Sequence, residues 1–216
     1  MLCLQKSFTR SSSKKALLLA RKSFPTNKSV IAKLSADAAA LPLDDDEELF
    51  ASYSAQEEVD EANERYRNRI QISETSDRGW GVVALKTFTV GELVLKSKAL
   101  GAIPRDTHTL QKGWDKHVMI DAPGRLINHS CNGNLGLQDN DAGAYDFFAR
   151  REIREGEELT WDYETTEYEI RGFEKCNCGD ALCRGTVGGF KKHGDQIKAQ
   201  YGMKYIANYL KNKMDS

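Results

Sequence analysis

Short apolar stretches separated by glycine-containing turns fill the middle of the chain. Ile70-Gln71-Ile72 alternates between apolar and polar positions, as a half-buried β-strand does. Apolar residues at 82–85 and 93–95 lie on either side of the turn Thr89-Val90-Gly91-Glu92. The same pattern continues at 118–120, 145–149 and 159–163. The pattern therefore predicts a mainly β domain over residues 68–166.

The C-terminal part of the chain has a different spacing. Ile197, Tyr201, Tyr205 and Tyr209 recur at four-residue intervals, which predicts a helix over residues 195–211. This helix belongs to an extension at 189–216. It either packs on the β domain or forms a dimer face, and the sequence leaves both open.

The first part of the chain divides by charge. Residues 1–36 contain eight Lys or Arg and no acid, which is typical of a transit peptide or of a disordered basic arm. Residues 37–61 contain ten acids and no base. We interpret 37–67 as an acidic linker with a short helix around Gln56 to Arg67. The expected location is intracellular, in the nucleus or in an organelle such as a chloroplast or mitochondrion.

Composition limits the partners. The 216 residues carry a formal net charge of −1, so no overall basic field predicts direct nucleic-acid binding. No run of 18 apolar residues occurs, so no membrane association is expected. The five cysteines do not form an even disulfide framework, which favours a reducing compartment.

Four of the five cysteines indicate a metal site. Cys176, Cys178 and Cys183 form C-x-C-x4-C, one thiol short of the four ligands of a closed zinc site. Cys131 is the best candidate for the fourth ligand, His193 is a conceivable substitute, and Cys3 in the leader is a poor one. Four thiolates leave no open position for water, so the predicted role is one structural zinc.

Four sequence blocks occur in order along the chain. The first three are Arg78-Gly79-Trp80-Gly81, Asn128-His129-Ser130-Cys131 and residues 156–163, GEELTWDY. The fourth is the cysteine motif followed by Arg184-Gly185. Together they resemble the SET-domain family of protein lysine methyltransferases, with a post-SET zinc segment at 167–188. The resemblance implies a β-clip-like SET fold of small curved sheets plus the C-terminal helix. It also implies a knot-like threading that brings the second block against residues 161–163.

The resemblance further implies a site for S-adenosylmethionine (SAM), the methyl donor, and a channel for the substrate lysine. Glycines let a ligand approach the backbone closely, and Asn and His supply donors and acceptors. Tyr163 is the expected catalytic residue, because a tyrosine hydroxyl can orient the amine of a neutral lysine. The expected SAM-binding residues are Gly79, Trp80, Gly81, Asn128, His129 and Tyr163.

Trp161 lies two residues before this tyrosine, where family members commonly carry Phe or Tyr and where the residue affects how many methyl groups are added. Trp has no phenol to hold a water against the amine. We therefore predict that Trp161 permits more than monomethylation.

The predicted function is SAM-dependent methylation of a lysine side chain in a protein substrate, histone or non-histone. The alternatives are a non-catalytic SET-like module that recruits partners and an enzyme acting on a small amine. The short stretch from Gly101 to Leu126 and the absence of a cysteine cluster before Ile70 indicate a compact, stand-alone member. Histone specificity does not follow, and the substrate and oligomeric state stay open.

Overall fold

The computed structural model describes residues 56–106, 108–171 and 175–212. The predicted leader at 1–36 and most of the acidic linker lie outside these residues. No described helix is long and apolar enough to cross a bilayer.

A helix and a hairpin begin the described chain. The helix α4 (Gln56–Arg65) buries Val59 and Ala62, and the antiparallel strands β1 (Ile70–Glu74) and β2 (Trp80–Ala84) follow it. The Asn63 side chain holds both backbone groups of Ile72, accepting from its N–H at 2.7 Å and donating to its carbonyl at 3.2 Å. These contacts attach the helix to the edge of the hairpin.

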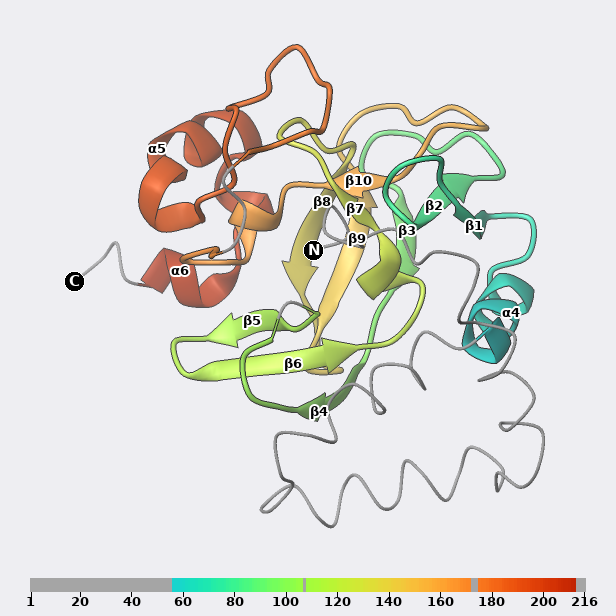
Figure 1. Cartoon of the computed structure of the whole chain (residues 1–216), viewed down its shortest axis with the longest axis horizontal. Helices are drawn as coiled ribbons and strands as arrows, with labels where there is room; N and C mark the ends of the chain where they lie inside the picture. The colour runs from blue at the N-terminus through green and yellow to red at the C-terminus, as the bar shows by residue number, and fades with distance from the viewer. Residues whose placement is uncertain (1–55, 107, 172–174, 213–216) are drawn as a thin grey trace, which may run out of the picture.

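A five-stranded sheet forms the centre of the domain (Figure 1). Its antiparallel half contains β3 (Leu93–Lys96), β9 (Tyr145–Ala149) and β8 (Leu135–Asp139). The short strands β10 (Thr160–Trp161) and β7 (Asn128–His129) complete it, in the order β3-β9-β8-β10-β7. Inward-facing residues such as Leu135, Leu137 and Phe147 are almost fully buried, which explains the alternation seen in the sequence.

The strand β10 lies between β7 and β8 and runs parallel to both. The chain from β7 to β8 crosses it closely, because a Cβ atom built on Gly133 would lie 2.5 Å from the Cα of Trp161. The Ser130 N–H donates to the Trp161 carbonyl at 3.0 Å, and the Asn134 side chain accepts from the Thr160 N–H at 2.9 Å. The predicted contact between the Asn128-His129 segment and residues 161–163 is therefore confirmed.

A second, three-stranded sheet lies below the first in Figure 1. It has the order β4-β6-β5, with β4 (Ala99–Ala102), β6 (Lys116–Ile120) and β5 (Leu110–Gly113). The short helix η3 (Gly124–Leu126) then leads into β7. The small sheets match the predicted mainly β fold.

The C-terminal extension packs on the domain, on the side away from α4 in Figure 1. It contains α5 (Phe190–Tyr201), η5 (Met203–Tyr205) and α6 (Asn208–Asn212), so the prediction of one helix over 195–211 is wrong. Gly202, with φ of +63°, ends α5 in a conformation that favours glycine. The Tyr205 ring then covers Gly136 of β8, where a Cβ atom would meet it at 2.3 Å.

Candidate functional site

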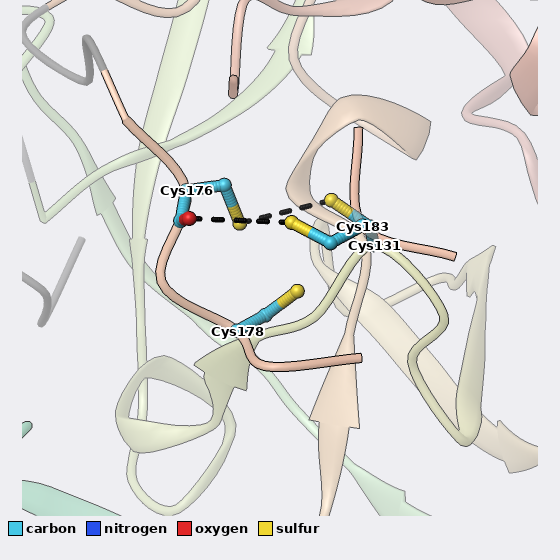
Figure 2. A group of neighbouring side chains, drawn as sticks. All are labelled: Cys131, Cys176, Cys178 and Cys183. Atoms are coloured by element: carbon cyan, nitrogen blue, oxygen red, sulfur yellow. Dashed lines mark hydrogen bonds between the residues drawn. The ribbon is translucent and has the colours of Figure 1, made fainter. Parts of the chain in front are cut away.

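The four cysteines predicted to share a metal come together. Figure 2 shows Cys131, on the turn after β7, facing three cysteines of the C-terminal segment. All four sulfur atoms lie within 4.8 Å of one another, and those of Cys131 and Cys176 are 3.7 Å apart. A tetrahedral zinc site with bonds of ~2.3 Å requires sulfur atoms roughly 3.8 Å apart. The cluster therefore fits a four-coordinate ion, and Cys131 rather than His193 completes it.

Burial determines the protonation of the cysteine thiols and of the neighbouring His129. Burial raises the pKa of the Cys131 and Cys176 thiols, so these two thiols keep their protons until a cation displaces them. Burial also lowers the pKa of His129 to about 3, which keeps its imidazole neutral. Its Nδ1 accepts from the Tyr163 N–H at 3.3 Å, so the proton sits on Nε2, 3.5 Å from the Cys131 sulfur. His129 thus links the cysteine cluster to Tyr163, and its 3.8 Å approach to Asp162 is not an ion pair.

A buried ionic network adjoins the cluster. Arg184, next to Cys183, donates to Asp162 at 2.8 Å and lies 3.0 Å from Glu164. Glu164 also accepts from the Gly188 N–H at 2.6 Å and lies 2.8 Å from Nδ1 of His193. Burial raises the pKa of Asp162 to about 6. Removing one member would leave its buried partners without a counter-charge, so the network fixes the C-terminal segment against the residues around Tyr163.

A second network joins the first block to the second. The Glu158 carboxylate accepts hydrogen bonds from the Arg78 guanidinium at 2.7 Å and from the Asn128 side-chain amide at 2.9 Å. Asn128 also donates to the Trp80 carbonyl at 3.1 Å. Its side-chain donors are therefore used within the protein, and its backbone lies in β7 opposite Thr160 of β10. A Cβ atom on Gly81 would lie 2.6 Å from the Thr75 side chain and 3.2 Å from both Asn128 and Glu158, so protein packing favours glycine here.

Three aromatic rings stand in series beside these networks. The Tyr163 ring centre lies 4.6 Å from that of Trp161 and 5.1 Å from that of His129. Tyr163 is 4% exposed, and its hydroxyl donates to the Ile127 carbonyl at 3.0 Å. Gly79, with φ of +71°, forms the turn that precedes Trp80. The structure thus gathers the predicted site residues of β2, β7 and β10 in one place.

Sequence reasoning missed the roles of the charged residues around this site. Arg184, Glu158 and Asp162 stood inside the recognised blocks, but sequence alone gave no reason to expect them buried or partly buried, since charged residues are usually exposed. Their position in the blocks was the one available signal. Tyr201 and Gln200 gave no signal of their role, because their partners lie 68 to 70 residues away.

Part of this chain matches a known protein family. Residues 79–164 match the family model described as "SET domain". These residues contain the Gly79–Gly81 turn, β7, β10 and Tyr163. The helix α4 precedes the matched stretch, and the cysteine segment and the C-terminal extension follow it.

Curated relatives that match part of this chain include histone-lysine N-methyltransferases. The chain is 34% identical to ash1 of Drosophila melanogaster over 135 residues, which are 53% of this chain and 6% of that protein. It is 30% identical to ASHR3 of Arabidopsis thaliana over 165 residues, 65% of this chain and 32% of that protein. It is 42% identical over 154 residues to the "Histone-lysine N-methyltransferase, H3 lysine-36 specific" of Mycosarcoma maydis, covering 59% of this chain and 16% of that protein. The chain thus spans a third or less of these relatives.

Solved structures with a similar fold include Arabidopsis thaliana SUVH6 in complex with SAM, with a TM-score of 0.43 and 23% identity. That match covers 55% of this chain and 33% of SUVH6. The methyltransferase domain of human SETMAR matches with a TM-score of 0.43 and 20% identity, over 56% of this chain and 58% of that one.

Proposed function

We propose that this chain transfers methyl groups from SAM to the side-chain amine of a lysine in a protein substrate. The observation that carries this proposal is the convergence of three distant segments on Tyr163. The turn before β2, the strand β7 and the strand β10 are joined by the Asn128–Trp80 hydrogen bond and by the β7–β10 pairing. Their motifs belong to the part of the chain that matches the SET domain.

The site suits a sulfonium ligand. Aromatic faces attract cations, and Trp161, Tyr163 and His129 place three rings next to one another. The Asn128 side chain is held by Glu158 and by the Trp80 carbonyl, which ties β7 to β2 at this site. We assign Gly79, Trp80, Gly81, Asn128 and His129 to SAM binding, with Tyr163 between this site and the lysine.

The bound cofactor supplies an electrophilic methyl group that an amine can take by in-line displacement. The protein has to align the amine and keep it neutral, although free lysine has a pKa near 10.4. The burial of Tyr163 and of the neighbouring Trp161 ring disfavours an ammonium ion. The Tyr163 hydroxyl, held by the Ile127 carbonyl, can orient the amine lone pair. The lysine nitrogen would gain the methyl carbon as the carbon–sulfur bond breaks, and the sulfonium would leave as a neutral thioether. The methylated nitrogen, now positively charged, would release a proton to solvent.

We further propose that Cys131, Cys176, Cys178 and Cys183 hold one structural zinc. Four convergent sulfurs satisfy the ion completely, so it activates no water. Zinc would tie the C-terminal segment to the turn after β7. Order in that segment and metal binding should therefore be coupled.

A histone tail is the first substrate to test, because the relatives named above are histone-lysine N-methyltransferases. Non-histone proteins stay open, and nothing in the sequence requires chromatin. An organellar location of this chain would exclude histones. A fusion of residues 1–60 to a fluorescent protein would report the location.

The test is a methylation assay with the full chain and a Tyr163→Phe variant. Both are incubated with isotope-labelled SAM and either recombinant histones or a whole-cell extract, and labelled lysines are identified by mass spectrometry. We expect label with the wild type and a loss of at least about a hundredfold with Tyr163→Phe, because orientation and proton control contribute on this scale. SAM binding, measured by calorimetry, should stay near normal in the variant.

Two outcomes would contradict the proposal. Equal labelling by both proteins would remove Tyr163 from its catalytic role. Absence of both label and SAM binding in the wild type would favour the non-catalytic SET-like module instead.

A further inference from the structure

The turn that carries Cys131 is held by the last residues of α5. The Tyr201 hydroxyl donates to the Cys131 carbonyl at 3.0 Å and accepts from the Gly133 N–H at 3.2 Å. The Gln200 side chain donates to the same carbonyl at 2.9 Å and to the Asn132 side chain at 3.2 Å. One turn of a helix outside the SET match thus contacts every residue from Cys131 to Gly133.

Arg150 supports this arrangement from the other side. Its guanidinium lies 3.8 Å from the centre of the Tyr201 ring and donates to the Gly133 carbonyl and, at 3.3 Å, to the Gln200 carbonyl. Tyr201 is 5% exposed, and burial raises the pKa of its hydroxyl, so the hydroxyl keeps its proton and donates. The turn is therefore bound by neutral and charged donors that are themselves fixed.

The position of this turn affects two parts of the site. On one side it carries the Cys131 sulfur, the one cysteine of the cluster that comes from the SET domain itself. On the other side Gly133 lies against the backbone of Trp161, two residues before Tyr163. A shift of the turn would move a metal ligand and β10 together.

We propose that Tyr201 and Gln200 are positioning residues that hold Cys131 in place for zinc, and that the C-terminal extension is thereby part of the metal site. The inference rests on the proposed zinc site. The inference adds that zinc binding depends on residues that bind no metal themselves and lie beyond the cysteine motif. Mutation of residues that surround and orient metal ligands typically changes metal affinity by about 10–100-fold.

The experiment measures zinc release. Full-length wild type, Tyr201→Phe and the control Tyr209→Phe are loaded with zinc and mixed with a chromophoric chelator in excess. Tyr209 is a matched control, because it lies in the same extension, is buried, and donates its hydroxyl to the Thr166 carbonyl, away from the cysteines. The melting temperature of each protein is measured in parallel.

We expect zinc release about tenfold faster in Tyr201→Phe than in wild type. The Tyr209→Phe control should release zinc at the wild-type rate even if its melting temperature falls equally. Gln200→Met, which keeps Tyr201 in place, should also release zinc faster. This variant replaces Tyr201→Phe in the test if Tyr201→Phe does not fold.

Equal release rates in wild type, Tyr201→Phe and Gln200→Met would overturn the inference while leaving the zinc site intact. Equal acceleration in Tyr201→Phe and Tyr209→Phe would assign the effect to general loss of stability and overturn it too. A wild-type protein that binds no zinc would instead overturn the proposed metal site on which the inference depends.

Discussion

The close crossing of the Cys131–Asn134 connection over β10 leads to a sharp prediction for Gly133→Ala. The added methyl group would lie 2.5 Å from the Cα of Trp161 and 2.8 Å from the Thr160 carbonyl oxygen. Carbon atoms in contact prefer ~3.5–4.0 Å, so the two backbones must separate by roughly 1 Å. Both neighbours are backbone atoms of a paired strand, so no side chain can simply rotate away.

The expected cost comes from two sources. Overpacking of a filled interior costs about 1–3 kcal/mol. The separation also breaks or lengthens the hydrogen bond from Ser130 to the Trp161 carbonyl, worth about 1 kcal/mol. The total of roughly 2–4 kcal/mol corresponds to a fall in melting temperature of roughly 5–15 °C for a chain of this size.

Thermal unfolding followed by circular dichroism would measure this change. Gly101→Ala is the matched control, because no atom lies within 4 Å of a Cβ built on Gly101 in β4. Its melting temperature should stay within about 2 °C of wild type. Equal melting temperatures for Gly133→Ala and wild type would refute the close crossing of β10. Turnover by Gly133→Ala should also fall at temperatures where it is fully folded, because β10 leads directly to Tyr163.

Three further predictions concern the metal, the product and pH. Cys183→Ser should lose about one zinc per chain and its methyl-transfer activity together, measured by elemental analysis and labelling, and a fully active zinc-free protein would contradict the structural role. Exhaustive reaction of the wild type should give more than the monomethyl product because of Trp161, and a mass spectrum with only one added methyl would count against this. Burial raises the pKa of Glu167 from 4.5 to about 7, so the folded state binds more protons than the unfolded state between these values. The free energy of unfolding should therefore fall as pH rises through this window, by ~1.4 kcal/mol per unit of pKa shift. The fall should be smaller in Glu167→Gln than in wild type, as denaturant titrations at pH 5 and 7 would measure.

Local patterns predicted the strands but not their neighbours. The predicted strand at 145–149 coincides with β9, and that at 93–95 lies within β3, because alternation reports which face of a strand is buried. The predicted strand at 159–163 is shorter in the structure. Asp162 accepts from the Glu164 N–H and caps the short helix η4 (Tyr163–Thr165), which ends β10 at Trp161. The order of the central sheet depends on pairings between residues some 30 positions apart, which periodicity does not encode.

The candidate site was predictable where ligand chemistry fixes residue types. Cysteine spacing predicted the cluster that the structure brings together, and the blocks predicted Asn128, His129 and Tyr163, which the structure places close to one another. The charged residues that hold this region in place were not predictable, because Arg184 and Glu158 lose exposure to water only through tertiary pairing. The break in the C-terminal helix at Gly202 was also missed, since the tyrosine spacing continues across it.

The central position of β10 has a consequence for the order of folding. β7 and β8 cannot take their final places in the sheet until residues 160 and 161, roughly 25–30 positions later in the chain, lie between them. Tyr201, whose hydroxyl bonds the connection between β7 and β8, lies another 40 residues further along the chain. Its hydrogen bond therefore forms later still. Contacts so distant in sequence slow folding, because the intervening loops must be closed first. We therefore expect the hairpin β1–β2 and the sheet β4-β6-β5 to form early during synthesis, and the catalytic centre to form last.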